Sequence, residues 1–407
     1  MESPRLRWAI LACGKVSHDF VQALKLLPTQ QVVAVGARKH EDAQAFVAKH
    51  CDGAQAFGSY ADAAACDTVD AVYIGTLHPW HREHAEMALR CGKHVLVEKP
   101  IAMNRADAAA IYAAGAAAGK LVLEGMWTRF FPAVKQTREL LASGTIGTLA
   151  EVKGSFGVDA ASDIGTYPSD TVFQQPLGGG AVTLLGPYLV QAALLGFRLP
   201  SAFEAVDVSD GELDAHRLLG SGCRLAAAGI VDAPPPNGGG AELTGAATIV
   251  FPPRDAAAAA GGSGGPGGGR AFAGLGAGGG GAGGVAVLSC SLIAESAEEV
   301  CFVGSKGSLT LRPPAHCPTA LTLRLKGDGR GAAAEVRELV EPLPEEPALV
   351  VERGGFIMPN SIGFAYEAAG FASAVAAGLL ECAEWTHAES LACLELLDEW
   401  RKQVVAK

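Results

Sequence analysis

The stretch LRWAILACGKVS, residues 6–17, contains an apolar run, a tight turn and the start of a helical pattern. The same alternation continues to about residue 124, with the apolar runs QVVAVGA, DAVYIGT, HVLVEKP and KLVLEG separated by helical segments. Short apolar runs that alternate with helices are typical of βαβ units with a parallel sheet covered on both faces. We therefore predict such a domain over residues 1–125.

The pattern of apolar residues changes beyond about residue 145. Segments such as LAEVKGSFGV, ELTGAATIVF and EVCFVGSKGSLTLR run between turn signals, as antiparallel hairpins do. The C-terminal segments YEAAGFASAVAAG and HAESLACLELLDEWRKQ return to helical spacing. The chain is therefore predicted to be an α/β protein whose second domain, residues 126–407, carries a mainly antiparallel sheet.

Residues 255–284 are rich in glycine and alanine. Glycine at this density cannot bury enough side chain to offset its backbone entropy, so we predict a flexible insertion at a hairpin tip, where long loops cost little. The alternative, a phosphate-binding glycine loop, lacks both a lysine and a following helix.

Charge and cysteine content narrow the class of protein. The net charge of −11 provides no basic surface for nucleic acid or anionic lipid. The ten cysteines form no CxxC pair, no apolar stretch reaches membrane-spanning length, and no secretory signal precedes the first apolar run. We expect a cytoplasmic protein that binds a small-molecule substrate and has neither a nucleic-acid nor a membrane partner.

The turn after the first apolar run contains candidate residues for a dinucleotide pyrophosphate, namely Ala12, Gly14, Lys15 and Val16. A dinucleotide fingerprint needs glycine for the turn, glycine for close approach to the phosphates and a small residue for helix packing. Only the middle position is glycine here, so the motif alone is weak. Its place before a helix favours a Rossmann dinucleotide-binding domain, because a helix N-terminus there points at a phosphate.

The second apolar run ends in Arg38 and not in an acidic residue. An acid at this position binds the ribose 2′-hydroxyl of NAD, whereas an arginine suits the 2′-phosphate of NADP. The sequence therefore favours NADP, and the alternative is a solvated basic loop.

The segment GTLHPWHREH, residues 75–84, places Thr76, His78 and His81 after another strand. The three histidines of this segment suggest a metal site, but there is no HExxH pattern and no obvious carboxylate ligand. We predict no metal, and we expect these residues to line the crevice where a nucleotide lies.

The residues Glu98, Lys99 and Pro100 follow the apolar run VLV directly. The simple alternative is that charged residues mark a strand exit. A lysine at this edge of the sheet would instead meet cofactor and substrate, and it could lower the pKa of a neighbouring phenol or relay a proton. Pro100 would fix the backbone beyond it, with the cis form as one option.

Several blocks in order, among them YIGTLHPWH, GKHVLVEKPIAMN, EGMWTRFFPA, GTIGTL, LGGGAVTLLGPY and HCPT, resemble the glucose–fructose oxidoreductase/inositol dehydrogenase (Gfo/Idh/MocA) family over nearly the whole chain. The resemblance implies a Rossmann domain and a C-terminal domain with an open antiparallel sheet that pairs in a homodimer. It also implies metal-free hydride transfer between NADP and a hydroxyl-bearing carbon, in a trans-dihydrodiol or in a pentose such as D-xylose.

The resemblance also assigns roles to single residues. It makes Lys99 and Tyr188 catalytic, the tyrosine as general acid/base, and it places Glu98, Trp127 and Arg129 at the cofactor. Phe156, Leu184 and Tyr188 would line the substrate. The alternative for Trp127, Phe156 and Arg129 is a pair of core aromatics and a surface arginine.

Two departures from the family pattern bear on activity. Ala12 replaces the first fingerprint glycine, and Leu184 stands where the family has an aspartate that would share a helix face with Tyr188. These departures keep two alternatives open: a sugar or polyol dehydrogenase with an altered substrate, or a catalytically silent NADP(H)-binding protein.

Overall fold

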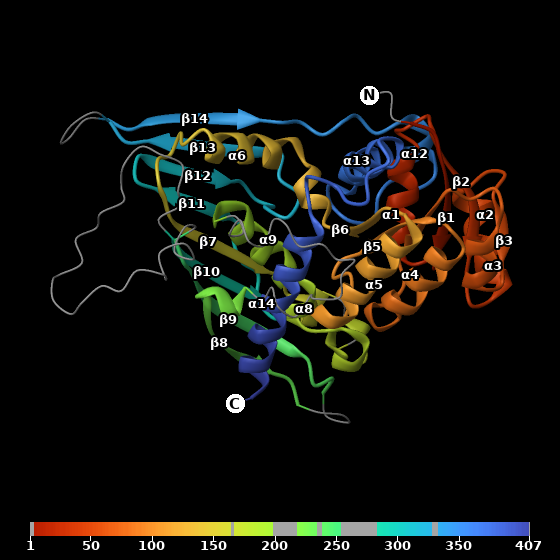
Figure 1. Cartoon of the computed structure of the whole chain (residues 1–407), viewed down its shortest axis with the longest axis horizontal. Helices are drawn as coiled ribbons and strands as arrows, with labels where there is room; N and C mark the ends of the chain where they lie inside the picture. Colours follow the sequence, from red (N-terminus) through yellow and green to blue (C-terminus); the bar gives the residue numbers. More distant parts are fainter. Residues whose placement is uncertain are drawn as a thin grey trace.

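The structure is a computed structural model that describes residues 4–163, 167–197, 218–233, 238–253, 283–327 and 333–406. It contains a six-stranded sheet and an eight-stranded sheet, which lie toward opposite sides of the molecule in Figure 1. The C-terminal helix α14 (His387–Val405) crosses between them and packs against elements of both parts.

The six-stranded sheet is parallel throughout, and its strand order is β3-β2-β1-β4-β5-β6. The strands are β1 (Leu6–Leu11), β2 (Gln30–Gly36), β3 (Gln55–Phe57), β4 (Ala71–Ile74), β5 (His94–Glu98) and β6 (Val122–Gly125). The connecting helices are α1 (Lys15–Leu24), α2 (His40–His50), α3 (Tyr60–Ala65), α4 (His81–Arg90) and α5 (Arg105–Ala118), with the short η1 (His78–Trp80). This confirms the predicted Rossmann fold, and the order reverses beside β1, where such sheets bind nucleotides.

The apolar runs that predicted these strands are buried, as expected for a sheet covered on both faces. Trp8 and Ile10 of β1, and Tyr73 of β4, are fully buried. Tyr73 stacks on Phe20 of α1 with 3.9 Å between ring centroids. This core holds the carboxyl ends of β1, β2, β4 and β5 at one edge of the sheet.

The second sheet has the order β14-β13-β12-β11-β7-β10-β9-β8, and only β7 and β10 pair in parallel. Its strands are β7 (Leu149–Gly157), β8 (Arg224–Val231), β9 (Glu242–Phe251), β10 (Gly284–Ser291), β11 (Val300–Gly304), β12 (Gly307–Leu311), β13 (Ala320–Leu325) and β14 (Glu335–Val340). The mainly antiparallel sheet is therefore confirmed. Its antiparallel pair β9–β10 flanks the predicted glycine-rich insertion, of which residues 254–282 lie outside the described residues.

Helices from the middle and the end of the chain cover one face of this second sheet, chiefly α9 (Gly186–Phe197), α6 (Pro132–Ala142) and α14. On the opposite face, Val287 of β10 is 44% exposed. The short elements that precede α9 are η2 (Trp127–Phe130), α7 (Ala160–Asp163), η3 (Thr171–Phe173), η4 (Gln175–Leu177) and α8 (Ala181–Leu184), and η5 (Leu219–Ser221) precedes β8.

The chain returns to the Rossmann domain near its end. The elements α12 (Ala348–Glu352), η6 (Ser361–Gly363) and α13 (Phe364–Ala376) follow β14, and the last two pack on α1. The buried carboxylate of Asp19 on α1 accepts hydrogen bonds from the backbone N–H groups of Ile357 (2.8 Å) and Met358 (2.9 Å). Segments more than 300 residues apart in sequence thus close one face of the first sheet.

Among the described residues, no single helix is long and apolar enough to cross a membrane. The residues Gln175–Leu184 and Gly186–Phe197 together meet the length and composition criteria but are bent by 44° at their junction. Most of α9 is buried in this structure, where it covers the second sheet.

Candidate active site

The turn after β1 presents an open cradle at the N-terminus of α1. Gly14 is the N-cap residue, no side chain caps the helix there, and a Cβ added to Gly14 would meet no atom within 4 Å. The buried hydroxyl of Ser17 also lacks a hydrogen-bond partner among the described residues. Free backbone N–H groups, an unpartnered hydroxyl and open space above a glycine fit a dinucleotide pyrophosphate.

Ala12 adopts the backbone conformation that a glycine would have in the fingerprint. Its φ angle is +78°, in the left-handed region, and its N–H donates to the carbonyl of Gly36 at 3.0 Å. Alanine in this region costs about 1–2 kcal/mol relative to the right-handed conformation. The departure from the family pattern therefore leaves the course of the turn intact at a modest cost in backbone energy.

The end of β2 places Arg38 at the surface of the carboxyl edge. Arg38, Lys39 and His40 are all exposed, and α2 begins at His40. Gly36, just before them, allows close packing, because a Cβ there would lie 2.9 Å from that of Ala63. The basic group is thus free to meet a phosphate next to the first turn.

The histidines after β4 lie within hydrogen-bonding distance of other groups of the protein. His81 is fully buried, with Nε2 2.8 Å from the carbonyl of Thr76 and Nδ1 3.0 Å from that of Pro100. Burial lowers the pKa of His81 to about 4, so the neutral ring donates to one carbonyl at a time. The ring of His81 thus joins two loops at the sheet edge, and its place along the crevice stays a prediction.

Thr76 and His78 remain closer to the surface of the edge. The hydroxyl of Thr76 lies 3.0 Å from Nδ1 of His84, and Nδ1 of His78 lies 3.1 Å from the carbonyl of Gly178 in the second part of the chain. Burial lowers the pKa of His78 to about 3. Among the described residues, no group of three or more His, Cys, Asp or Glu side chains is placed to hold a metal ion.

Lys99 lies between the two parts of the chain. Its ammonium donates to the carbonyl of Leu184 at 3.0 Å and lies 4.5 Å from the centroid of the Tyr188 ring. The peptide bond between Lys99 and Pro100 is cis. The strand-end lysine and the tyrosine predicted as its partner are thus in contact, although the ammonium faces the ring and not the hydroxyl.

A break between α8 and α9 creates the acceptor for Lys99. The N–H of Tyr188 donates to Leu185 (3.2 Å), so the carbonyl of Leu184 is left for the lysine. Leu184 ends one helix and Tyr188 lies in the next, across the 44° bend. The expectation that these two residues share one helix face is therefore wrong, because Gly186 and Pro187 start a new helix between them.

Two buried carboxyl groups, Glu98 and Glu124, lie near Lys99, and a third, Glu367, lies near both of them. Glu98 accepts from the hydroxyl of Tyr73 (2.7 Å), and Glu124 accepts from Ile101 N–H (3.0 Å) and from two side chains of the C-terminal segment, Trp385 and Ser390. Glu367 has no hydrogen-bond partner on either oxygen among the described residues. Burial raises the pKa of all three carboxyl groups and lowers the pKa of Lys99, while Glu98 and Glu124 oppose the shift at the lysine.

Aromatic rings surround Tyr188 on the other side. Phe156 lies 5.5 Å from its ring centroid, and Trp127 of η2 lies close enough for its indole N–H to oppose the upward shift of the Tyr188 pKa. Burial, followed by the charge of Glu98, raises the pKa of Tyr188 well above its ordinary value. The phenol is therefore protonated at neutral pH in this structure.

Arg129 is buried between η2, α9 and α14. Its side chain is fully buried and donates to Oε1 (2.5 Å) and the carbonyl (2.7 Å) of Gln191 and to Glu389 (2.9 Å). Its guanidinium also stacks on Trp385 at 4.7 Å. Its donors thus join η2, α9 and α14, and the assignment of Arg129 as a cofactor contact stays a prediction.

Two residues of this region had no predicted role, His316 and Tyr73. His316 stacks on Phe156 with 4.6 Å between centroids and lies 5.4 Å from Tyr188. The only signal in the sequence was the HCPT block, which carried no role. Tyr73 lies within a strand, where an aromatic residue predicts only core packing.

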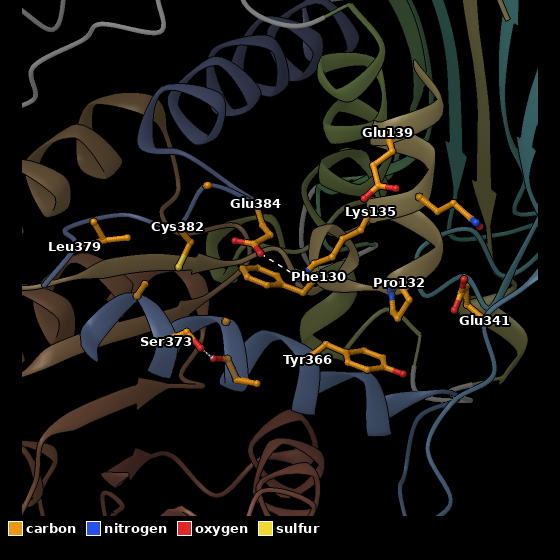
Figure 2. A pocket seen from close by; sticks show the side chains of 15 residues that line it. Phe130, Pro132, Lys135, Glu139, Glu341, Tyr366, Ser373, Leu379, Cys382 and Glu384 are labelled. Atoms are coloured by element: carbon orange, nitrogen blue, oxygen red, sulfur yellow. Dashed lines mark hydrogen bonds and ion pairs between the residues drawn. The ribbon is translucent and has the colours of Figure 1, made fainter. Parts of the chain in front are cut away.

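A separate cavity of about 770 Å³ opens between α6 and α13, and Figure 2 shows the side chains that line it. An ion pair between Lys135 and Glu384, 3.1 Å apart, lies in its wall, and Phe130 contributes an apolar surface. None of the residues predicted for cofactor or substrate lines it. This cavity is therefore distinct from the sheet edge where Lys99 contacts Tyr188.

Comparison with known families agrees with this geometry. Residues 6–126 match the oxidoreductase family described by its NAD-binding Rossmann fold, and residues 134–212 match the GFO/IDH/MocA C-terminal domain. Proteins named trans-1,2-dihydrobenzene-1,2-diol dehydrogenase from Danio rerio and Sus scrofa are 32% and 30% identical, and each alignment covers 98% of this chain and 97% of the relative.

Solved structures show the same fold at lower identity. A 3-ketoreductase from Actinomadura kijaniata, in complex with NADP and TDP-benzene, has a TM-score of 0.69 and 22% identity over 98% of both chains. A levoglucosan dehydrogenase in complex with NADH and levoglucosan has a TM-score of 0.72 and 17% identity, and the match covers 99% of this chain and 98% of that one. The arrangement of the two domains is thus shared with enzymes that act on different molecules.

Proposed function

Since this chain belongs to the Gfo/Idh/MocA family of oxidoreductases with a Rossmann dinucleotide-binding domain, we propose that it transfers a hydride between NADP and a hydroxyl-bearing carbon. The observation that carries this proposal is the contact of Lys99, from the end of β5, with Tyr188, from α9. The substrate class that the named relatives favour is a trans-dihydrodiol, with a pentose such as D-xylose as the alternative.

The residues at the edge divide the chemistry between them. A bound nicotinamide would supply the hydride acceptor or donor. Tyr188 exchanges a proton with the substrate oxygen, and Lys99 places a positive charge beside the phenol that favours its anionic form. Gly14 and the start of α1 would hold the pyrophosphate, with Lys15 and Val16 contributing backbone N–H groups. Phe156 and Trp127 would exclude water from the reacting groups.

The two departures from the family pattern still motivate rival functions. A sugar or polyol dehydrogenase of the same family would use the apolar side chain of Leu184 to select another substrate, and a silent NADP(H)-binding protein would bind cofactor without turnover. The tests are a fluorescence titration with NADPH and NADH, and an activity screen over diols, pentoses and aldehydes. Tight NADPH binding without any turnover would favour the silent protein over an enzyme.

Arg38 is expected to set the cofactor preference. Replacing Arg38 with alanine should weaken NADPH binding about tenfold or more, because a charge-assisted hydrogen bond to the 2′-phosphate is worth about 1.5–3 kcal/mol. Binding of NADH, which lacks that phosphate, should change less than about twofold. Fluorescence titrations of both cofactors measure the effect, and Arg90→Ala, which removes an exposed arginine from α4, serves as the matched control. Equal losses for both cofactors would refute the assignment.

A homodimer and a cytoplasmic location complete the proposal. The exposed face of the eight-stranded sheet supports dimerisation, since Val287 at its centre is 44% exposed and pairs with Thr248 and Lys153 on the neighbouring strands. Ile230 of β8, 56% exposed, lies on the same face, and apolar side chains that gather on one face are a feature of surfaces that bind a partner. Sedimentation equilibrium measures the mass, and a protein that stays monomeric at micromolar concentration would refute the dimer.

A further inference from the structure

An imidazole lies inside the aromatic cluster beside Tyr188, and the proposed reaction leaves it unused. The ring of His316 is nearly parallel to that of Phe156, with an interplanar angle of 17°. Its centroid lies 5.4 Å from that of Tyr188 and 6.1 Å from that of Trp127. His316 is therefore part of the wall around the group that exchanges the proton.

Backbone contacts fix the position of this histidine relative to η2. The hydroxyl of Thr128, next to Trp127, donates to the carbonyl of His316. The amide of Asn360 donates to the carbonyl of Cys317 at 3.1 Å, and the N–H of Ala315 donates to the carbonyl of Glu298 at 2.8 Å. Because three separate segments hold it, the imidazole is pre-organised beside the reacting groups.

A carboxylate lies behind the imidazole. Oε2 of Glu298 is 3.4 Å from Nδ1 of His316, within ion-pair distance. The backbone of Glu298 has a φ angle of +47°, which is uncommon for a residue other than glycine and often accompanies functional sites. A carboxylate next to one ring nitrogen sets the tautomer and orientation of a histidine, which prepares the other nitrogen for a ligand.

The polar groups of His316 and Trp127 beside Tyr188 can still form hydrogen bonds to a ligand. Nε2 of His316 lies 3.3 Å from the thiol of Cys317, which is a weak partner and leaves capacity for a ligand, while Nδ1 faces Glu298 at 3.4 Å. The buried indole N–H of Trp127 makes no aligned hydrogen bond in the described part of the chain, although it lies near enough to Tyr188 to oppose the upward shift of the pKa of that phenol. The side chain of His316 is 18% exposed, so the protein does not enclose it completely.

We propose that His316, oriented by Glu298, binds the second hydroxyl of a cyclic vicinal diol while Tyr188 acts on the first. This inference rests on the proposed function and names its substrate class. Phe156 and His316 stack on each other, and the outer side of this pair would suit a flat or nearly flat ring. A pentose carries additional hydroxyl groups that would need partners, whereas the rings around Tyr188 present mainly apolar surface.

The test is the variant His316→Phe, which keeps an aromatic ring against Phe156 and removes both nitrogens. Activity is measured with trans-1,2-dihydrobenzene-1,2-diol and with cyclohex-2-en-1-ol, which has a single hydroxyl. We expect kcat/KM for the diol to fall about tenfold or more, mainly through KM, and kcat/KM for the mono-alcohol to change less than about twofold. The variant Glu298→Gln should show a smaller loss in the same direction. Equal losses for the two alcohols would overturn the inference.

A calorimetric titration of the diol into NADP⁺-saturated protein separates this inference from the proposed function. Wild-type protein that binds the diol without oxidising it, and binds it at least about tenfold more tightly than His316→Phe does, would refute the dehydrogenase and support the diol site. Wild-type protein that binds the diol no more tightly than the variant overturns the inference, even if it oxidises another alcohol. NADPH affinity should be the same in both proteins, which confirms that the variant folds.

Discussion

Replacing Tyr188 with phenylalanine is expected to lower kcat about 10²–10⁴-fold, because a positioned general acid/base contributes this much to a proton transfer. The ring would still pack against Phe156 and under the ammonium of Lys99, so the fold and cofactor affinity should hold. The measurements are steady-state rates in both directions, with NADPH titration as the control. A variant as active as the wild type would remove Tyr188 from the reaction.

The pH dependence of the wild type should follow from the same phenol. Its pKa is raised well above the ordinary value, so Tyr188 is protonated through the neutral range and is ready to donate a proton during carbonyl reduction. Reduction should therefore be nearly constant from about pH 6 to 8, whereas alcohol oxidation, which needs the phenolate, should rise with pH. The rise in oxidation should disappear in Tyr188→Phe, and a residual rise of the same size would indicate another base.

The variant Lys99→Met tests whether the charge of the lysine affects the pKa of the Tyr188 phenol. Methionine at this position keeps most of the side-chain volume and removes the ammonium that lies 4.5 Å from the ring centroid and donates to Leu184. The wild-type lysine is buried beside Glu98. Its loss removes the positive charge that opposes the charge of Glu98 near Tyr188, so the pKa of the phenol rises further. The pH at which oxidation becomes appreciable should therefore move upward in Lys99→Met.

The sequence predicted the parallel sheet because its strands are buried on both faces and appear as continuous apolar runs. The same pattern placed Gly14, Arg38 and Lys99 at the carboxyl edge, since the topology brings those strand ends together. The three-residue strand β3 has too short a pattern to be recognised. The bend between Leu184 and Tyr188 had a local signal in Gly186 and Pro187, which favour the start of a helix.

The residues that the sequence could not place have contacts with residues that are distant in sequence. The residues next to Arg129 in the sequence do not indicate whether its side chain is buried or exposed. Its environment depends on Gln191 and Glu389, which are distant in sequence. His316 lies in the loop between β12 and β13, and the fold of the second sheet brings this loop next to Tyr188. No local sequence pattern predicts that contact. Residues that are fixed by strand ends were therefore easier to place than residues that are fixed by contacts between domains.

Arg129→Met is expected to destabilise the protein by about 3–5 kcal/mol, because breaking a buried ion pair by removing one partner leaves the other partner uncompensated. Oε1 of Glu389 and the two oxygens of Gln191 would lose the donors that Arg129 supplies, while Oε2 of Glu389 keeps its hydrogen bonds from Thr386. The stack on Trp385 would be lost as well. Urea unfolding at neutral pH measures the loss, with Arg138→Met on the neighbouring helix α6 as the control, since Arg138 donates to nearby carbonyls from a more exposed site.

Cofactor binding distinguishes this structural role from the one first expected of Arg129. Trp385 also donates to Glu124, which accepts from the N–H of Ile101, so the network of Arg129 reaches the loop that carries Lys99. We expect the folded fraction of Arg129→Met to bind NADPH within about threefold of the wild type while its unfolding midpoint falls. A stable variant with NADPH affinity reduced tenfold or more would instead place Arg129 at the cofactor, because direct loss of a charge-assisted hydrogen bond has that magnitude.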